Sequence, residues 1–408
     1  MADQRDVAIV GGGAAGIAAA RRLVDRKRSV LLIEALPRLG GRACSVTIGG
    51  VPLDFGCGWF HSAERNPLAA LAQREGLLLD RRENAWQISV SNAMYSADER
   101  QRARAAYEEF IERLHSGPPV SDRAADVAIA DEGWKPYINA LSSFINGTEL
   151  ADLSVADFLV YDDAASDANW RIKSGYGAFI AGLGADLPSA LSTRVASVSH
   201  DKAGFVLETD RGTIRAKAAI ITVSTTMLAT GKIRFSPSVD DHLQAAGCLP
   251  LGLADKFFLS VADPKSIPAD CHVMGRLDRA ETASYSLQPF GHPVIECYLG
   301  GACARALEEG GEPAAQAFAI GELRELFGAD FVRGLTPLAF TRWGHEPSIG
   351  GSYSHALPGH ANARAVLARP PSERLCFAGE ACSSKDFSTA HGAWQSGLTA
   401  ANWIEGSL

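Results

Sequence analysis

The sequence predicts an α/β fold, and three observations lead to this prediction. An apolar, β-branched run at Val7–Val10 predicts a buried strand, and the alanine-rich segment Ala14–Val24 behind it has the spacing of an amphipathic helix. A second apolar run, Ser29–Ile33, predicts another strand. A strand near residue 377 is expected to return to the same sheet, which makes this first domain discontinuous. The alternation of strand and helix is typical of a Rossmann-like domain.

A glycine-rich turn joins the first strand to the helix. Gly11, Gly13 and Gly16 follow the pattern G-x-G-x-x-G, in which the first allows a tight turn, the second admits a pyrophosphate and the third permits close packing. Glu34 lies 18 residues after Gly16, near the roughly 20 expected for an acid that binds a ribose hydroxyl. A purely structural turn is the alternative. The strand, helix and acid around the glycines favour dinucleotide binding, with NAD and FAD both open.

Composition and charge exclude several classes of protein. With 47 % hydrophobic and 21 % charged residues, the chain has the composition of a globular protein with a large core. A net charge of −8 argues against a nucleic-acid partner and agrees with a cationic substrate. The eight cysteines form no C-x-x-C pair and no zinc-ligand spacing, so we expect reduced thiols, no metal and a cytoplasmic location. The charged first residues and the lack of an 18-residue apolar window predict a soluble protein without a membrane segment.

The middle of the chain changes character and predicts a second domain. Helical spacing is expected over Leu68–Glu75, Asp98–Leu114, Asp131–Asn146, Phe179–Leu191, Pro313–Phe327 and from His391 onward. We interpret the charge-rich run Glu99–Arg113 as a solvated outer face. The helical insertion is expected to cover another part of the molecule.

Further strands are expected on both sides of this insertion. They are Val195–His200, Phe205–Thr209, Thr213–Ala218, Ala219–Val223, Lys256–Val261, Tyr285–Leu287 and Val294–Leu299, with a hairpin turn at residues 210–212. We therefore expect a first domain of residues 1–65, 172–247 and 346–408. The second domain comprises residues 66–171 and 248–345.

Seven separated motifs occur in a fixed order along the chain. They are GGGAAGIAAA with Glu34, LGGR ending at Arg42, DFGCGWFH at 54–61, RV at 194–195, LGLADKFFL at 251–259, RWG…GGSYS at 342–354 and FAGE…STAHGAWQSGL at 377–398. In these motifs the chain resembles the flavin-containing amine oxidases, which include monoamine oxidases, polyamine oxidases and flavin histone demethylases. The motifs and their flanks cover roughly half of the chain.

The resemblance implies a Rossmann-like FAD-binding domain and a discontinuous α+β substrate domain with a mixed sheet plus helices. It implies FAD contacts at Gly11, Gly13, Ala14, Ala15, Gly16, Glu34, Gly41, Arg42, Gly58, Trp59, Val195, Trp343, Glu380 and Ala393. The glycine turn would hold the pyrophosphate, the helix near His391 would direct its positive end at the flavin, and Glu380 would bind ribityl or phosphate groups. Ser352 stands where monoamine oxidases have the cysteine that tethers FAD, so the FAD is expected to be non-covalent. Leu36 replaces an arginine that many members carry.

The resemblance also implies four catalytic residues, Lys256, Tyr353, His61 and Thr389. On its own, Lys256 in an alternating strand would be assigned to a solvated face, because a buried lysine without a partner is unfavourable. In the family the lysine of this motif holds a water at flavin N5 and assists the reaction with oxygen. Tyr353 matches an aromatic residue that faces the flavin, and His61 matches a histidine near the substrate of animal polyamine oxidases. Thr389 replaces a second tyrosine of monoamine oxidases.

The expected function is FAD-dependent oxidation of a small amine, either a di- or polyamine or a primary or secondary monoamine. Hydride transfer to flavin N5 would be followed by imine hydrolysis and reoxidation by O2, which gives H2O2. An L-amino-acid oxidase or a desaturase of the same superfamily is one alternative, and Arg171 and Arg342 are candidates to bind an amino-acid carboxylate. A catalytically silent flavin-binding module is the second. The sequence leaves monomer and homodimer open.

Overall fold

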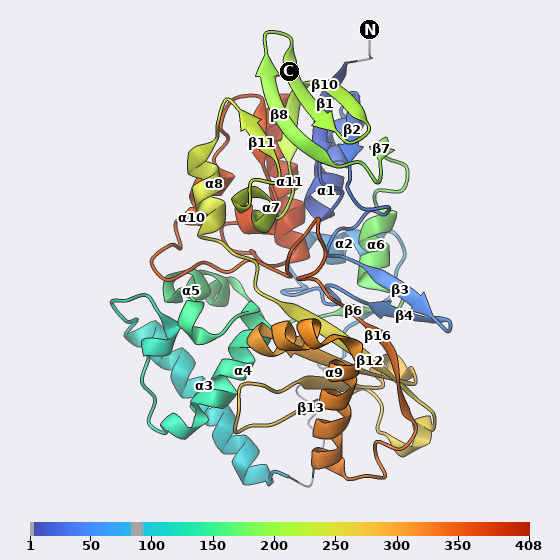
Figure 1. Cartoon of the computed structure of the whole chain (residues 1–408), viewed down its shortest axis with the longest axis vertical. Helices are drawn as coiled ribbons and strands as arrows, with labels where there is room; N and C mark the ends of the chain where they lie inside the picture. The colour runs from blue at the N-terminus through green and yellow to red at the C-terminus, as the bar shows by residue number, and fades with distance from the viewer. Residues whose placement is uncertain (1–3, 83–91, 93) are drawn as a thin grey trace.

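The chain forms two lobes, each built around its own β-sheet, in a computed structural model that describes residues 4–82, 92 and 94–408 (Figure 1). The first lobe contains an eight-stranded sheet, and the second contains a five-stranded sheet with a group of helices beside it. The observed mixture of helices and sheets confirms the predicted α/β fold class. Residues 1–3, where the sequence argues against a signal peptide, lie outside the described range.

The sheet of the first lobe has its earliest strand near the centre, in the order β11-β8-β9-β10-β1-β2-β7, with β17 paired to β10. Its strands are β1 (Arg5–Val10), β2 (Val30–Ile33), β7 (Ser189–Ala190), β8 (Val195–Asp201), β9 (Gly204–Thr209), β10 (Gly212–Ile221), β11 (Arg234–Ser236) and β17 (Leu375–Phe377). Strand β1 pairs in parallel with both β2 and β10, and β17 pairs in parallel with the end of β10. The predicted return of the chain to this sheet near residue 377 is therefore confirmed.

Strand β10 corrects one prediction, because the two strands expected at 213–218 and 219–223 are a single strand. Its first half pairs antiparallel with β9 through the predicted hairpin turn, and its second half pairs with β17 instead. Side chains in the first half are largely exposed, whereas those of residues 218–221 are buried. The apolar pattern of β10 changes where its pairing partner changes from β9 to β17, and no turn separates the two halves.

Helices cover both faces of this sheet. Val7 and Ile9 face a core shared with α1 (Ala14–Asp25) and α11 (Ala390–Glu405), whereas Ala8 and Val10 face the opposite core. Helix α2 (Pro67–Arg74), just after the expected domain boundary at residue 65, packs into the same core as α1 and α11. Helices α7 (Thr225–Ala229), α8 (Asp240–Gly247) and α10 (Ala363–Ala368) lie on the opposite side of the sheet. Burial on both faces explains the uninterrupted apolar run in β1.

The helix predicted over Phe179–Leu191 is wrong in extent. Helix α6 (Tyr176–Gly182) begins earlier, after Gly175 with its φ of +95°, and ends at Gly182. The next residues turn and lead into β7, and the carbonyl of Pro188 accepts the N–H of Leu32. Two glycines and a proline end the helix, although its apolar spacing continues.

The sheet of the second lobe is antiparallel, in the order β13-β14-β15-β12-β16. Its strands are β12 (Ala254–Val261), β13 (Cys271–Met274), β14 (Ser284–Leu287), β15 (Val294–Gly300) and β16 (Leu335–Phe340). The three strands predicted here fall within β12, β14 and β15. Helix α9 (Gly301–Phe327) covers this sheet and extends the predicted helix of residues 313–327 backward, with a break at Gly311, where φ is +74°.

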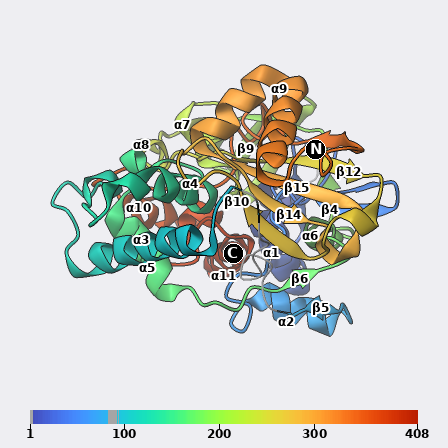
Figure 2. The same ribbon diagram turned by 90° about the horizontal axis from the view of Figure 1, so that it is seen from below.

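A helical group completes the second lobe. Helices α3 (Ala97–Ser116), α4 (Lys135–Asn146) and α5 (Val155–Ala164) share a core beside the five-stranded sheet, as two views show (Figures 1 and 2). The first two were predicted and α5 was not. The remaining paired segments are β3 (Ser45–Ile48), β4 (Val51–Asp54), β5 (Leu79–Asp80) and β6 (Arg171–Ile172).

Some features are absent from the described part of the chain. Within it, no helix has the length and apolar character needed to cross a bilayer. The same residues contain no group of His, Cys, Asp or Glu side chains that could hold a metal ion. All eight cysteines are free thiols, and four of them are buried.

Candidate active site

A cavity of about 870 Å³ is lined by residues of both lobes. All of the site residues predicted from the sequence line it, with the exception of Gly16. Those lining it are Gly11, Gly13, Ala14, Ala15, Glu34, Gly41, Arg42, Gly58, Trp59, His61, Val195, Lys256, Trp343, Tyr353, Glu380, Thr389 and Ala393. Residues from distant parts of the sequence therefore meet at one site, although their individual roles stay predictions.

The glycine turn leaves exposed backbone at one end of the cavity. Gly13 caps helix α1 without a side-chain hydrogen bond, and a Cβ on Gly13 would have only the carbonyl oxygen of Gly40 nearby, at 3.9 Å. The first N–H groups of a helix have no partner within it, so those of Ala14 and Ala15 point out of the helix start. A Cβ on Gly16, by contrast, would lie 1.9 Å from the carbonyl oxygen of Gly11, so Gly16 serves packing. This arrangement fits a pyrophosphate.

Glu34 ends strand β2 beside this turn. Its Oε2 accepts the backbone N–H of Gly12 at 2.5 Å, and its Oε1 accepts that of Leu36 at 2.7 Å. Burial raises the pKa of Glu34, and the two backbone donors oppose that rise only in part. The backbone holds this carboxyl group against the cavity wall, in a position that suits the binding of sugar hydroxyls.

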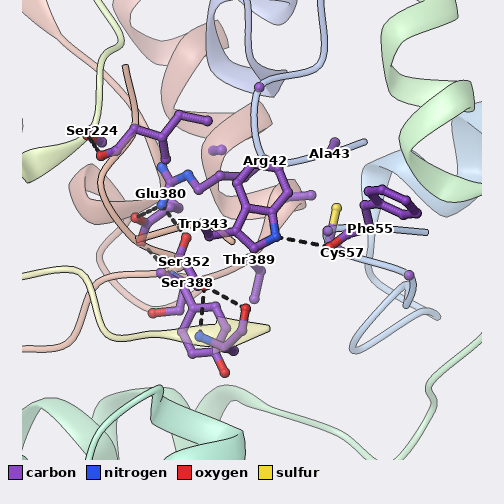
Figure 3. Close-up of a pocket in the computed structure, with 18 of the residues that line it drawn as sticks. Arg42, Ala43, Phe55, Cys57, Ser224, Trp343, Ser352, Glu380, Ser388 and Thr389 are labelled. Atoms are coloured by element: carbon purple, nitrogen blue, oxygen red, sulfur yellow. Dashed lines mark hydrogen bonds and ion pairs between the residues drawn. The ribbon is translucent and has the colours of Figure 1, made fainter. Parts of the chain in front are cut away.

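An ion pair joins two site residues that are far apart in sequence. Nη1 of Arg42 donates to Oε1 of Glu380 and to the carbonyl of Ser352, both at 2.8 Å (Figure 3). The other Glu380 oxygen accepts the Ser354 hydroxyl at 2.6 Å. Burial would raise the pKa of Glu380, but the charges of Arg42 and Arg364 outweigh burial and lower it. Glu380 is therefore ionised, and its carboxylate holds the Arg42 side chain in place.

Arg364 and Asp157 extend this network, and the sequence reasoning missed both. The buried guanidinium of Arg364 forms two hydrogen bonds with Asp157 of α5, at 2.6 and 2.8 Å. It also donates to the Ser354 hydroxyl at 2.8 Å. Neither residue lies in a recognisable motif, so only the fold could reveal that α5 supports Glu380 through this chain of bonds.

Lys256 lies in β12 with its side chain turned inward. Only 6 % of the residue is exposed, and its Nζ donates to the carbonyl of Asp54 at 2.8 Å and lies 3.0 Å from Oε1 of Glu296. Burial alone would lower the pKa of Lys256, but the negative charges of Glu296 and Asp54 outweigh burial and raise it. The side chain of Lys256 is thus a buried ammonium group in the cavity wall. This excludes the interpretation of Lys256 as a residue on a solvated face.

Aromatic side chains form the wall near this lysine. The indole Nε1 of Trp343 donates to the carbonyl of Phe55 at 3.0 Å, as drawn in Figure 3. The hydroxyl of Tyr353 donates to the carbonyl of Phe144 at 2.6 Å and lies 3.0 Å from the hydroxyl of Tyr298. Burial raises the pKa of Tyr353 well above its usual value, so it stays a neutral hydrogen-bond donor. Tyr298 was missed because no motif includes it.

His61 and Thr389 contact the cavity in different ways. Nδ1 of His61 lies 2.6 Å from Oδ1 of Asn169, and burial lowers the pKa of the imidazole. Thr389 caps helix α11 by accepting the N–H of Gly392 at 3.0 Å, and its hydroxyl donates to the carbonyl of Asp386 at 2.6 Å. The geometry gives Thr389 a role in positioning the start of α11, whose positive end faces the cavity at Ala390 and Ala393.

Two further side chains bear on how a cofactor could be held. The Ser352 hydroxyl donates to the carbonyl of Ala254 and accepts the N–H of Ala254, both at 2.8 Å. Cys57 is the one cysteine among the described residues that line the cavity. Burial and the nearby Asp54 raise the pKa of Cys57 to about 12, so it is a thiol at neutral pH. Neither side chain is activated as a nucleophile.

Helix α3 lines the cavity at its end in the second lobe. Arg100, Ala103 and Arg104 are all part of that wall. The interpretation of Glu99–Arg113 as a solvated face is therefore only partly right. Arginines at positions four residues apart lie on one face of a helix, and here that face meets a cavity which the sequence alone does not reveal.

Comparisons with known proteins agree with this geometry. The family model described as "Flavin containing amine oxidoreductase" matches residues 14–404. The chain is 28 % identical to polyamine oxidase 2 of Arabidopsis thaliana over 97 % of its length and 87 % of that protein. It is 27 % identical to lysine-specific histone demethylase 1 homolog 2 of Oryza sativa subsp. japonica, covering 98 % of the chain and 56 % of that protein.

The fold is also similar to a solved structure. Wild-type putrescine oxidase bound to putrescine superimposes with a TM-score of 0.77 at 19 % sequence identity, and the match covers 99 % of each chain. At this identity the likeness concerns the fold alone. It agrees with the predicted α/β fold, and the roles predicted for the two lobes stay predictions.

Proposed function

The chain belongs to the flavin-containing amine oxidoreductases, and on this premise we propose that it oxidises a small amine with non-covalently bound FAD and O2. The observation that carries the proposal is the placement of Lys256 and Tyr353 in the same cavity as the glycine turn and Glu34. The polyamine oxidases among its relatives support an amine substrate.

Bound FAD would supply the redox chemistry: removal of a hydride from the carbon beside the amine nitrogen and transfer of the two electrons to O2, which would leave H2O2 and an imine that water hydrolyses. The residues of the glycine turn, Glu34 and Arg42 would hold its nucleotide and phosphates. The start of α11 would place a positive dipole end beside the flavin. These assignments follow the chemistry of the groups that line the cavity.

The chain's own residues have two tasks in this reaction. The aromatic wall around Tyr353 excludes water and favours the neutral form of the amine, because burial disfavours an ammonium ion without a partner. Lys256 supplies a fixed positive charge, held by the Asp54 carbonyl and Glu296, where oxygen would be reduced. Orientation and electrostatics are thus the contribution of the protein.

The alternatives from the sequence receive less support. Arg171 is held by Asp80 and Asp270, at 2.9 and 3.3 Å, and lies outside the cavity wall. Arg342 also lies outside it and donates to the carbonyl of Glu308 at 3.2 Å. Neither candidate can therefore clamp the carboxylate of an α-amino acid in this cavity.

The proposal is tested by mixing the purified yellow protein, without oxygen, with mono-, di- and polyamines and with amino acids. We expect the flavin absorbance to bleach with at least one amine and to return, with formation of H2O2, when air is admitted. An oxidised spectrum with every amine tested would overturn the proposed function.

A further inference from the structure

The end of the cavity in the second lobe carries more positive than negative charge. Arg100 and Arg104 line it from α3, and Glu296 lines it from β15. Glu296 is the one carboxylate on this side among the described lining residues, and it already lies 3.0 Å from Nζ of Lys256. A ligand that extends to this end therefore meets two guanidinium groups. The one carboxylate there is already paired with Lys256.

The charge pattern of helix α3 changes at these two arginines. Arg102 pairs with Asp98 at 3.1 Å, and Arg113 pairs with Glu109 at 2.7 Å, in each case with an acid four residues earlier. The residue four positions before Arg104 is Arg100, and like charges at this spacing destabilise a helix. The unfavourable pair lies on the face that lines the cavity.

Arg100 and Arg104 differ in the partners that the described residues offer them. Arg100 donates to the carbonyl of Tyr95 at 2.5 Å, but Arg104 forms no hydrogen bond or ion pair with any residue that the structure describes. Five N–H donors in a planar fork match the two oxygens of a carboxylate. Arg104 is exposed to the solvent, and an anion between the two arginines would relieve their repulsion and accept N–H groups that no described residue accepts.

The surrounding groups are apolar or uncharged. Leu141 and Leu277 line this end, and the imidazole Nε2 of His272 lies 2.7 Å from the Ser284 hydroxyl. Burial and the nearby charge of Arg104 lower the pKa of His272 to about 4, so it adds no charge at neutral pH. Tyr137 also lines the cavity, and burial raises the pKa of its hydroxyl, so it is neutral as well. A hydrocarbon chain could lie here between two polar ends.

We propose that the substrate is an amine with a carboxylate at the end remote from the oxidised carbon, and that Arg104 binds this carboxylate with Arg100. This inference rests on the proposed amine oxidation and narrows its substrate class. A diamine or polyamine would instead place a second ammonium group beside two arginines. The amine-directed end and the carboxylate-directed end are separate, so the substrate is not an α-amino acid.

Matched pairs of compounds test the inference. Putrescine is compared with 5-aminopentanoate and n-pentylamine, and 1,8-diaminooctane with 9-aminononanoate and n-nonylamine, so that only the remote group differs within a set. Anaerobic flavin reduction is followed for each compound. We expect the amino acid to have the higher second-order rate constant at one chain length or both, by about tenfold, as a charge-assisted hydrogen bond predicts.

Variants of one helix assign the effect to Arg104. We expect Arg104→Gln to reduce the preference for the amino acid over the alkylamine by about tenfold, and Arg104→Glu to shift the preference toward the diamine. Arg102→Gln is the matched control, because Arg102 is paired with Asp98 and does not line the cavity. An equal loss in the control would overturn the assignment.

Calorimetry with octanoate, which has no amine to oxidise, gives a second readout. We expect octanoate to bind the wild-type holoenzyme about tenfold more tightly than Arg104→Gln. If alkylamines reduce the flavin but no carboxylated amine is preferred, the inference fails and the proposed function stands. If no amine reduces the flavin, the proposed function fails, and octanoate binding that does not depend on Arg104 would overturn the anion site as well.

Discussion

A buried charge at the centre of the site depends on neighbours from other elements. Lys256 lies in a strand whose first six residues are buried, so its ammonium group is largely withdrawn from bulk solvent and faces the cavity. The Asp54 carbonyl and Glu296 stabilise it instead. Replacing one partner of such a group leaves the other buried without compensation.

We expect Lys256→Met to slow oxygen-dependent reoxidation of the reduced flavin by at least tenfold, because it removes the positive charge that stabilises reduced oxygen. Reduction by the amine should change less. Stopped-flow mixing of reduced enzyme with oxygenated buffer measures the rate. A reoxidation rate equal to that of the wild type would remove this role from Lys256, and Arg102→Gln provides a surface control.

The raised pKa of a second buried group, Asp255, leads to a prediction of how the free energy of unfolding depends on pH. Asp255 is fully buried and accepts hydrogen bonds from the Thr341 hydroxyl at 2.8 Å and the backbone N–H of Trp343 at 3.1 Å. Burial and the neighbouring Glu308 raise the pKa of Asp255 to about 8. Between pH 4 and 8 the folded state thus holds a proton that the unfolded state has lost, and stability must fall as pH rises through this window.

We expect the free energy of unfolding to decrease by on the order of 1 kcal/mol per pH unit from this group between pH 5 and 8. Urea unfolding at several pH values measures the slope. Asp255→Asn should flatten it, whereas Asp25→Asn, at an exposed position, should leave it unchanged. A slope that survives in Asp255→Asn would show that other groups cause it.

At the scale of the element, close packing of two helices sets the position of the site. Helices α1 and α11 start at opposite ends of the sequence, and both direct their first turns at the cavity. A Cβ on Gly397 would lie 2.1 Å from the carbonyl oxygen of Ala15, so glycine is what allows this approach. The distance between the two helix starts therefore depends on one missing methyl group.

We expect Gly397→Ala to destabilise the fold by roughly 1–3 kcal/mol, because the added carbon forces backbone to move. Gly321→Ala is the matched control in α9, since a Cβ there has no atom within 4 Å. That control should be neutral or stabilising by about 0.5–1 kcal/mol. Denaturant midpoints compare the two, and equal stability of both variants would contradict the packing argument.

At the scale of the whole molecule, the cavity is assembled across the chain. Arg42 and Glu380 are separated by 338 positions, and their ion pair links the segment after β2 to the segment after β17. A ligand that contacts both lobes binds only the folded state, so it raises stability. The fold thus couples occupation of the cavity to the association of the two lobes.

We expect FAD to be released from the protein by denaturation, because neither the Ser352 hydroxyl nor the Cys57 thiol is available as a nucleophile. Acid or heat precipitation should leave yellow flavin in the supernatant, and the flavin-free protein should melt at a lower temperature than the loaded protein. A yellow pellet with a colourless supernatant would show a covalent bond.

Sequence patterns predicted the parts of the molecule that depend on local order. The β1 strand, the glycine turn, Glu34 and the strand at residue 377 follow from apolar runs and fixed spacings, which neighbouring residues determine. Helix α5 and the Asp157–Arg364 pair had no such signal. For the helix after Phe179, apolar spacing alone predicted an end at Leu191, whereas the helix ends at Gly182.

By itself, the sequence determined that a glycine-rich turn with the dinucleotide-binding pattern follows the first strand and that the motifs of a flavin-containing amine oxidoreductase come after it. Only the tertiary structure decided which side chains share the cavity, which face of β12 carries Lys256 and that Arg100 and Arg104 of α3 line the cavity. The reason is physical. A residue's type and spacing set its local conformation, whereas burial, ion pairing and pKa depend on groups that folding brings from distant parts of the chain.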